Sequence, residues 1–266
     1  MKNDKQHIRI STKNLSIGFL QKKEQIIIAK DINISIKKGK FIGLLGKNGI
    51  GKSTLLRTLS KVQNPLNGEI KINEKNIENF TNKELAKNLS LVLTERLPES
   101  QLTVYELIAL GRQPYTNWLD KISKSDQVKI EWAIEQTTIT HLINKKVHEL
   151  SDGQLQRVLI ARALAQDTEV IILDEPTAHL DMHHTYKIFQ LLKKLVETTS
   201  KTIIVSTHQI NLAIEIVDEL IIMKPNELVH NSTQKIIKSD VLDDLFPKEI
   251  LNFNKRLQQF TIRKNN

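Results

Sequence analysis

A glycine-rich segment that contains a lysine and a serine has the composition of a phosphate-binding loop. Residues 46–54 read GKNGIGKST and fit the pattern G-x-x-x-x-G-K-[S/T]. Glycines let the backbone turn tightly, so that several N–H groups converge on one anion at the start of a helix. Lys52 would contact the β- and γ-phosphates of a nucleotide, and the Ser53 hydroxyl would bind Mg²⁺. The candidate nucleotide-binding residues of this loop are Gly46, Lys47, Asn48, Gly49, Ile50, Gly51, Lys52, Ser53 and Thr54.

Two adjacent carboxylates, Asp174 and Glu175, follow the apolar run Val170–Leu173. Open α/β sheets bind their ligands at the carboxyl ends of the strands, and an apolar strand that ends in two acids fits such a site. We expect Asp174 to hold Mg²⁺ and Glu175 to orient and deprotonate the water that attacks the γ-phosphate. The alternative is a strand that ends in solvated acids before Pro176.

A second anion site is indicated by residues 150–154, LSDGQ, which precede an amphipathic helix over 155–165. Ser151 is placed to cap this helix, and Gly153 leaves room for a close approach of another backbone. The alternative is an ordinary helix cap without a ligand.

The elements that must position these residues alternate between strands and helices. Phe41–Leu45 is an apolar run before the loop, and leucines recur at helical spacing over residues 53–61 after it. Apolar runs with helices between them indicate a parallel sheet that is covered on both faces. Further runs of this kind lie at 170–173, 202–206 and 220–223.

Before the loop, residues 8–10 and 14–19 alternate as two strands, and residues 26–36 contain two more short runs, which predicts an antiparallel sheet. Residues 96–165 have helical patterns and no strand-like run. The predicted fold class is therefore α/β: a P-loop NTPase core of mainly parallel sheet, with an antiparallel β subdomain and an inserted helical subdomain.

The composition excludes several function classes. The chain has 266 residues with 39% hydrophobic content, enough for a sizeable core, and no cysteine, which excludes disulfides and thiolate metal sites. We expect a cytosolic protein, because no apolar run approaches the ~18 residues of a membrane span and residues 1–7 lack the apolar core of a secretion signal. The net charge is +9, but the lysines are scattered along the sequence, so we do not predict nucleic-acid binding.

Taken in their order along the chain, the motifs resemble those of the nucleotide-binding subunit of an ATP-binding cassette (ABC) transporter, and the resemblance covers nearly the whole chain. The family's phosphate loop matches residues 46–54, its signature motif matches 150–154, and its magnesium and catalytic acids match Asp174 and Glu175. Its D-loop resembles residues 178–181, which include Asp181. The resemblance implies ATP as the nucleotide and Mg²⁺ as its cation.

The resemblance also implies roles for residues at strand ends. His208, just after residues 202–206, would be the switch histidine that hydrogen-bonds the γ-phosphate and holds Glu175 and water in register. Phe19 would stack on adenine, although a core or edge phenylalanine fits its local pattern equally well. Two copies of the chain would close head to tail on two ATP molecules. Each γ-phosphate would then meet one subunit's loop and the partner's signature residues Ser151, Gly153 and Gln154.

Two positions depart from the family's pattern. Glu95 stands where the family usually has a glutamine; it would still offer an oxygen to Mg²⁺ while adding negative charge near phosphate, and Gln101 is the alternative. Asp152 stands where glycine is commonest in the signature. His179, His183 and His184 lie around the D-loop, and we expect surface histidines there rather than a metal site.

Residues 104–112 and Pro114–Tyr115 resemble ATPases of importers for iron–siderophore complexes, haem or cobalamin. This resemblance implies an integral-membrane permease as partner, contacted by Tyr115 and Trp118, and an extracytoplasmic solute-binding protein. The ATPase would lie on the cytoplasmic face of the cell membrane. The alternatives are a soluble ABC ATPase that acts on ribosomes or DNA and the ATPase of an exporter with separate subunits; kinases and GTPases share only the phosphate loop.

We expect residues 1–266 to form a single ABC ATPase domain. Residues 1–95 and 166–225 would form the nucleotide-binding core with its antiparallel β part, 96–165 the helical subdomain, and 226–266 a C-terminal extension.

Overall fold

A six-stranded sheet lies at the centre of the fold. The computed structural model describes residues 7–22, 24–94, 100–116, 121–225, 227–243, 245 and 251–262. In spatial order the strands of this sheet are β11 (Glu227–Ser232), β10 (Glu219–Lys224), β4 (Phe41–Gly46), β9 (Thr202–Ser206), β8 (Val170–Leu173) and β7 (Leu89–Val92). The five strands from β10 to β7 run parallel, and β11 pairs antiparallel with β10 at the edge. The predicted α/β class and its parallel core are confirmed, with residues 227–232 added to the sheet.

Alternate residues of β4 face two separate hydrophobic cores. Phe41 and Leu45 belong to the core that contains α6 (Met182–Thr199), and the Phe41 and Phe189 ring centroids lie 6.0 Å apart. Ile42 and Leu44 belong to the other core, which contains α1 (Lys52–Leu59) and the antiparallel sheet. Because successive side chains of a strand point to opposite faces, β4 is held on both sides, and its carboxyl end is fixed.

The antiparallel sheet precedes the phosphate loop in the chain, as predicted. Its strands are β1 (Ile8–Gln21), β2 (Glu24–Ile32), β3 (Ser35–Lys37), β5 (Asn67–Ile72) and β6 (Lys75–Asn76), in the order β2-β1-β5-β6 with β3 paired to β1. The sequence predicts two strands at 8–10 and 14–19, whereas the structure has one. Asn14 adopts a left-handed φ of 48° where the register with β5 shifts, and asparagine tolerates this conformation, so the strand continues through a bulge.

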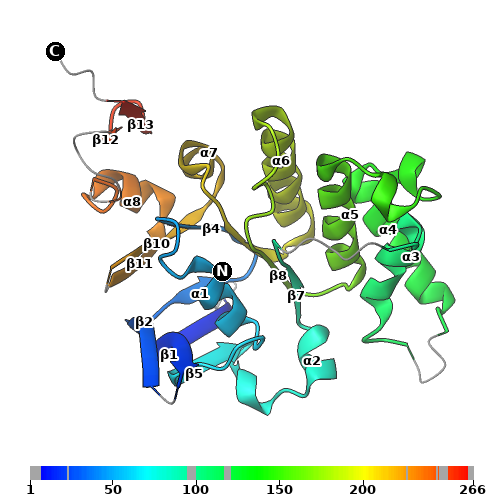
Figure 1. The fold of residues 1–266 in the computed structure, drawn as a ribbon, viewed down its shortest axis with the longest axis horizontal. Coiled ribbons are helices and arrows are strands. Elements are labelled where there is room, and N and C mark those ends of the chain that lie inside the picture. Colours follow the sequence, from blue (N-terminus) through cyan, green and yellow to red (C-terminus); the bar gives the residue numbers. More distant parts are fainter. Residues whose placement is uncertain are drawn as a thin grey trace, which may run out of the picture.

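The remaining helices cover the sheets and form the helical region. They are α2 (Asn82–Ala86), α3 (Val104–Ala109), α4 (Lys124–Thr137), α5 (Asp152–Ala165), α7 (Ile210–Ile216) and α8 (Thr233–Lys238), with short 3₁₀ turns at Ile77–Asn79, Leu110–Arg112, Thr140–Leu142 and Val147–Glu149. Figure 1 shows α3, α4 and α5 together at one end of the molecule. In the described part of residues 96–165 no strand of either sheet occurs.

A buried ion pair connects two parts of this helical region. Arg112 Nε lies 2.8 Å from Asp126 Oδ1, and both side chains are almost fully buried. Burial alone would raise the pKa of Asp126, but hydrogen bonds from Ser123 and Arg112 outweigh it and lower that pKa. The Tyr115 ring packs against Arg112, whose guanidinium carbon lies 3.9 Å from the ring centroid. Tyr115 is thus held in place, while Trp118 lies outside the described residues.

The C-terminal residues form a hairpin of β12 (Leu251–Asn254) and β13 (Gln259–Ile262) at the opposite end of the molecule from the helical region (Figure 1). Asn211 of α7 binds it through two hydrogen bonds, from Nδ2 to the Phe260 carbonyl at 3.3 Å and from the Phe260 N–H to Oδ1 at 2.8 Å. Among the described residues, no helix is long and apolar enough to span a bilayer.

Candidate active site

The loop at residues 46–54 joins β4 to α1, as the sequence predicts. Gly49 and Gly51 have φ values of 75° and 110°, in the left-handed range that favours glycine. A Cβ on Gly51 would lie 2.3 Å from Cγ2 of Ile28 in β2, so a side chain here would clash with the Ile28 side chain. The antiparallel sheet therefore buttresses the loop at Gly51.

The N-terminus of α1 is open to an anion. Its N-cap residue is Gly51, which offers no side-chain cap, and its first turn carries no acidic residue. The first backbone N–H groups of a helix have no partner within the helix, and the helix dipole places partial positive charge there. Residues 47–49 before it are exposed. The loop therefore has the shape and the polarity that the predicted phosphate cradle requires.

Lys52 lies beneath this loop with its ammonium surrounded by oxygen atoms. The side chain is 4% exposed, and Nζ donates to the carbonyls of Gly46 at 3.2 Å and Lys47 at 3.3 Å. Glu175 Oε1 lies 3.6 Å from the same nitrogen. Burial lowers the pKa of Lys52, and the charges of Glu175 and Asp174 offset part of that effect. The contacts of the Lys52 ammonium with the two carbonyls and the carboxylate are long, so an incoming phosphate can replace them.

The two acids follow β8 directly and point to different partners. Asp174 is 2% exposed, and its Oδ1 accepts a hydrogen bond from Ser206 Oγ at 2.7 Å. Glu175 has a left-handed φ of 46° and its backbone N–H donates to the same Ser206 oxygen at 2.8 Å. Adjacent acids with separate environments can carry separate roles.

His208 lies two residues beyond β9 and contacts the second acid. Its Nε2 is 2.6 Å from Glu175 Oε1. The structure thus brings together four residues that the sequence separates widely, Lys52, Asp174, Glu175 and His208. They meet because β4, β9 and β8 are parallel neighbours whose carboxyl ends share one edge of the sheet.

The oxygen donors at this edge fit Mg²⁺. A serine hydroxyl and a carboxylate are hard ligands of the kind that Mg²⁺ prefers, and Mg²⁺ commonly binds through one or two such groups together with phosphate oxygens. Ser53 is half-buried at the start of α1. Within the described residues, the second oxygen of Asp174 accepts no hydrogen bond, and no group of three or more histidines and acids forms a complete metal site. Glu95, the third predicted ligand, lies outside the described residues.

The predicted signature residues lie at the start of α5. Ser151 is the N-cap, and its Oγ accepts from the N–H of Gln154 at 3.4 Å, while Gln154 Oε1 accepts from the N–H of Ser151 at 3.1 Å. A Cβ on Gly153 would lie 3.2 Å from the ring of His184, so glycine lets α5 approach α6 closely. In the described residues, no hydrogen bond or ion pair links Ser151 to the phosphate loop.

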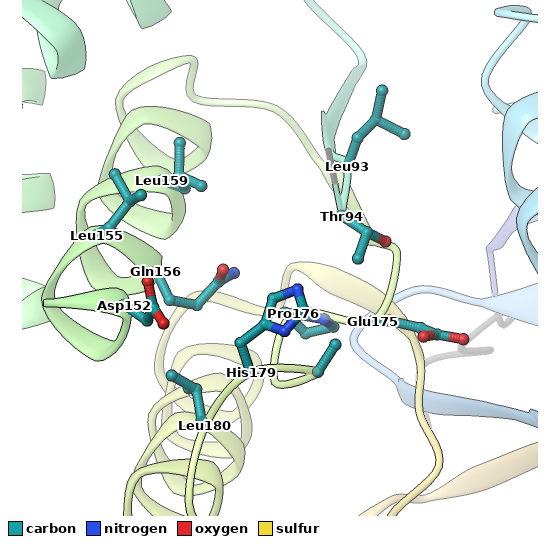
Figure 2. A pocket seen from close by; sticks show the side chains of 11 residues that line it. Leu93, Thr94, Asp152, Leu155, Gln156, Leu159, Glu175, Pro176, His179 and Leu180 are labelled. Carbon is teal, nitrogen blue, oxygen red and sulfur yellow. The ribbon is translucent and has the colours of Figure 1, made fainter. Parts of the chain in front are cut away.

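A pocket separates α5 from the acids. Figure 2 shows Asp152 and Gln156 on α5 facing Pro176 and His179, with Glu175 on the far side of Pro176 from α5. The Nε2 of Gln156 is buried without a hydrogen-bond partner in the described structure. Asp152 of the signature segment and Glu175 of the same chain therefore border a common space.

Asp181 caps α6 in its own chain. Its Oδ1 accepts from the backbone N–H of His184 at 2.8 Å, and its Oδ2 lies 2.8 Å from Nδ1 of the same residue. These contacts lower the pKa of the exposed Asp181 carboxyl, chiefly through the backbone hydrogen bond. The predicted nucleotide contact of Asp181 stays a prediction, and within its own chain the carboxylate caps α6.

Phe19 lies near the phosphate loop through a cross-strand pair. It pairs with Ile26 of β2, two residues from Ile28, which contacts the loop at Gly51. Phe19 is 47% exposed, which leaves a ring face available to a base. Leu20 follows it on the opposite face of β1 and is 69% exposed.

Sequence reasoning missed three contributors to the site. Ile26 and Ile28 look like ordinary strand residues, and only the β1–β2 register brings them beside Phe19 and the loop. Ser206 looks like the last residue of a strand, yet its hydroxyl joins both acids. The signal that could have indicated Ser206 is a hydroxyl side chain at the end of a buried strand that neighbours the strand ending in the two acids.

Comparisons with known proteins identify the family. The family described as "ABC transporter" matches residues 29–178. The iron(3+)-hydroxamate import ATP-binding protein FhuC of Bacillus subtilis (strain 168) is 36% identical over 238 residues, 89% of this chain and 87% of that protein. The ferric enterobactin transport ATP-binding protein FepC of Escherichia coli (strain K12) is 32% identical over 239 residues, 90% of this chain and 87% of that protein.

This chain belongs to the ABC transporter family. A dimeric, post-hydrolysis structure of the ATP-binding cassette MJ0796 with ADP and Pi superimposes with a TM-score of 0.73 at 32% identity, over 84% of this chain and 98% of that one. The chain is accordingly an ABC ATPase that binds and hydrolyses ATP, and the resemblance drawn from its motifs is confirmed.

If Phe19 stacks on adenine in this ABC ATPase, Phe19→Ala should weaken ADP binding ~5-fold or more, because stacking of a base on an aromatic ring contributes about 1–3 kcal/mol. Leu20→Ala removes a more exposed apolar side chain from the opposite face and should change the affinity less than ~2-fold. Isothermal titration calorimetry with ADP measures both. Equal losses of ADP affinity in the two variants would show that the end of the β1–β2 hairpin as a whole, rather than the Phe19 ring, supports binding.

Proposed function

We propose that this chain powers an importer for iron–siderophore complexes, with haem and cobalamin as alternative solutes. The support is the function of two relatives, one an iron(3+)-hydroxamate import ATP-binding protein at 36% identity and one a ferric enterobactin transport ATP-binding protein at 32%. A separate integral-membrane permease would carry the solute, and an extracytoplasmic solute-binding protein would deliver it. The ATPase would sit on the cytoplasmic face of the cell membrane, attached to the permease.

In this proposal residues 1–266 act as a single ATPase domain. Residues 1–95 and 166–225 supply the nucleotide-binding core, and residues 96–165 supply the helical subdomain that meets the permease. Tyr115 is a candidate contact, because its ring is already fixed against Arg112 and its packing would cost little further entropy on docking. Residues 226–266 follow the core and contribute the edge strand β11.

The observation that carries the ATPase mechanism is the position of the Glu175 carboxylate between two cationic or proton-donating groups. Its Oε1 lies 2.6 Å from His208 Nε2 and 3.6 Å from Lys52 Nζ. When ATP enters, Lys52 contacts the β- and γ-phosphates, which frees Glu175 to accept the proton of the attacking water. His208 then holds Glu175 and the γ-phosphate in register.

Mg²⁺, held by Ser53, Asp174 and Glu95, would neutralise charge on the phosphate oxygens. The residues of this chain then have distinct tasks. Ser53 and Thr54 lie in the first turn of α1 and present backbone N–H groups there, and Asp174 stays buried and anchored by Ser206. Phe19 would orient the base.

We further propose that two copies of the chain share each ATP. The start of α5 carries Ser151, Gly153 and Gln154 but contacts no phosphate loop in its own chain among the described residues. A capped helix N-terminus that faces outward favours an anion supplied from outside the chain. The dimeric cassette with ADP and Pi at 32% identity supports this arrangement. In it, Asp181 of the D-loop would lie near the shared nucleotide.

Glu175→Gln should reduce ATP turnover by ~10²- to 10⁴-fold while ATP still binds, because the amide keeps the shape of the side chain but cannot accept the proton. Phosphate release and nucleotide titration measure the two quantities. Glu169→Gln is the matched control, since Glu169 immediately precedes the same strand, at its other end, and pairs with Arg9. Unchanged turnover in Glu175→Gln would move the base to another residue.

Ser151→Ala should lower turnover by at least ~10-fold, since one lost donor to a reacting phosphate typically costs that much or more, and should abolish ATP-induced dimers in the Glu175→Gln background. The monomer should bind ATP as the parent protein does. Thr103→Ala removes a comparable cap from α3 and should leave turnover and dimerisation intact. Light scattering reports the dimers. Loss of ATP binding by the Ser151→Ala monomer would contradict a role across the interface.

The importer proposal is tested by recovering tagged Glu175→Gln protein with ATP from gently solubilised membranes. We expect a polytopic permease among its partners by mass spectrometry, because ATP without hydrolysis holds the closed dimer. The same protein without ATP is the control for adventitious capture. Recovery of ribosomal proteins or DNA instead would overturn the importer and leave the ATPase chemistry in place.

A further inference from the structure

One hydroxyl group joins the two acids of the ATPase site. Ser206 is the last residue of β9 and is fully buried. Its Oγ donates to Asp174 Oδ1 at 2.7 Å and accepts the backbone N–H of Glu175 at 2.8 Å. A serine hydroxyl has a single hydrogen to donate, so its donor is committed to Asp174 and one lone pair to Glu175.

The contact with Asp174 determines how that carboxylate can be used. Asp174 is 2% exposed, and a buried carboxylate is costly unless hydrogen bonds compensate it. Because Oδ1 is engaged by Ser206, the second oxygen is the one available to a cation. Thr94 Oγ1 also donates to the Asp174 carbonyl at 2.7 Å, and the Asp174 N–H donates to the Val92 carbonyl at 2.8 Å. The residue is thus fixed at its backbone as well as at its side chain.

The contact with Glu175 stabilises an unfavourable backbone conformation. Glu175 has a φ of 46°, which is uncommon and unfavourable for a residue with a Cβ. Its N–H would otherwise lack the strand partner that the preceding residues have. The hydrogen bond to Ser206 holds this turn, and the turn directs the side chain toward His208.

Ser206 also connects these acids to the switch histidine through the chain. His208 is two residues further along, and the N–H of the intervening Thr207 donates to the Leu44 carbonyl of β4 at 3.3 Å. The end of β9 is therefore tied to β4, to Asp174 and to Glu175 within three consecutive residues.

We propose that Ser206 is a positioning residue of the ATPase site, which orients Asp174 toward Mg²⁺ and holds Glu175 in its strained backbone conformation. This inference rests on the proposed roles of Asp174 and Glu175. Ser206 itself touches no reacting atom; it acts by holding the two residues that do.

A purely structural role would satisfy buried polar groups and nothing more. Such a role would lower the stability of the Ser206→Ala variant without changing its response to the cation. Ser90 of β7 provides the matched control, because it is also a buried serine in the same sheet and accepts a hydrogen bond from Thr168 Oγ1 at 3.0 Å. It pairs with Ile171, three residues before Asp174.

The test compares Ser206→Ala, Ser206→Thr and Ser90→Ala in the full chain. Steady-state kinetics give kcat and KM for ATP. In the Glu175→Gln background, where turnover is blocked, electron paramagnetic resonance measures Mn²⁺ binding to the ATP-bound protein, which is a readout independent of activity. ATP binding in EDTA measures the affinity for the nucleotide without a divalent cation, and the thermal unfolding midpoint of each variant measures its stability.

We expect Ser206→Ala to lower kcat ~10-fold or more, to weaken Mn²⁺ binding ~5-fold or more, and to leave ATP binding in EDTA within ~2-fold, because the lost hydrogen bond is made to the charged Asp174 carboxylate and not to the nucleotide. Ser206→Thr retains the hydroxyl and should recover most of both losses. Ser90→Ala should match the parent protein in kcat and Mn²⁺ affinity. If Ser206→Ala does not fold, Ser206→Cys replaces it, because cysteine has the same shape but a thiol that donates only weakly. We then expect Ser206→Cys to lower kcat and Mn²⁺ affinity, and parental values of both would overturn the inference.

Parental kcat and Mn²⁺ affinity in Ser206→Ala would overturn the inference, as would equal losses in Ser206→Ala and Ser90→Ala. The proposed function is judged separately. If Glu175→Gln abolishes turnover while Ser206→Ala does not change it, only the role of Ser206 fails. If Glu175→Gln turns over ATP at the parental rate, the assigned base fails whatever Ser206 does.

Discussion

The site depends on the carboxyl ends of three neighbouring parallel strands meeting at one edge of a sheet. β4 delivers the phosphate loop, β8 delivers Asp174 and Glu175, and β9 delivers Ser206 and His208. Two hydrophobic cores hold this sheet, one on each face. Lys52 and Glu175, which are 123 positions apart in the chain, therefore place their charged groups 3.6 Å from each other.

The electrostatics of this edge favour an anion that arrives with a cation. Lys52 is buried among carbonyl oxygens and lies 3.6 Å from Glu175, so it is only partly compensated. The α1 N-terminus is uncapped by any side chain, and Asp174 has one oxygen not engaged by a hydrogen bond in the described structure. The phosphates of a nucleotide would bind the Lys52 ammonium and the α1 N-terminus, and an accompanying Mg²⁺ would bind the second oxygen of Asp174. This joint requirement explains why neither the loop nor the acids alone indicate the function.

Much of the fold and site could be predicted from the sequence because the chemistry is local. The loop, the acids, Ser151 at a helix start and His208 at a strand end are each defined by a few consecutive residues, and each lies where the local pattern placed it. The strand order is not local. The pairing that brings Ile28 against Gly51, the continuation of β1 through Asn14 and the approach of Gly153 to His184 all depend on tertiary packing. Ser206 was overlooked for the same reason, since its partners lie on another strand.

The cap of α5 shows how one residue can serve two chains. Ser151 Oγ uses a lone pair to accept the N–H of Gln154, and at 3.4 Å this bond is near the outer limit of hydrogen bonding. The hydroxyl hydrogen is not consumed by that contact. A phosphate oxygen from a second subunit could therefore accept it while the helix remains capped. On this argument the closing of two subunits on ATP need not disrupt α5, and the free energy of the new contact is available to stabilise the closed state.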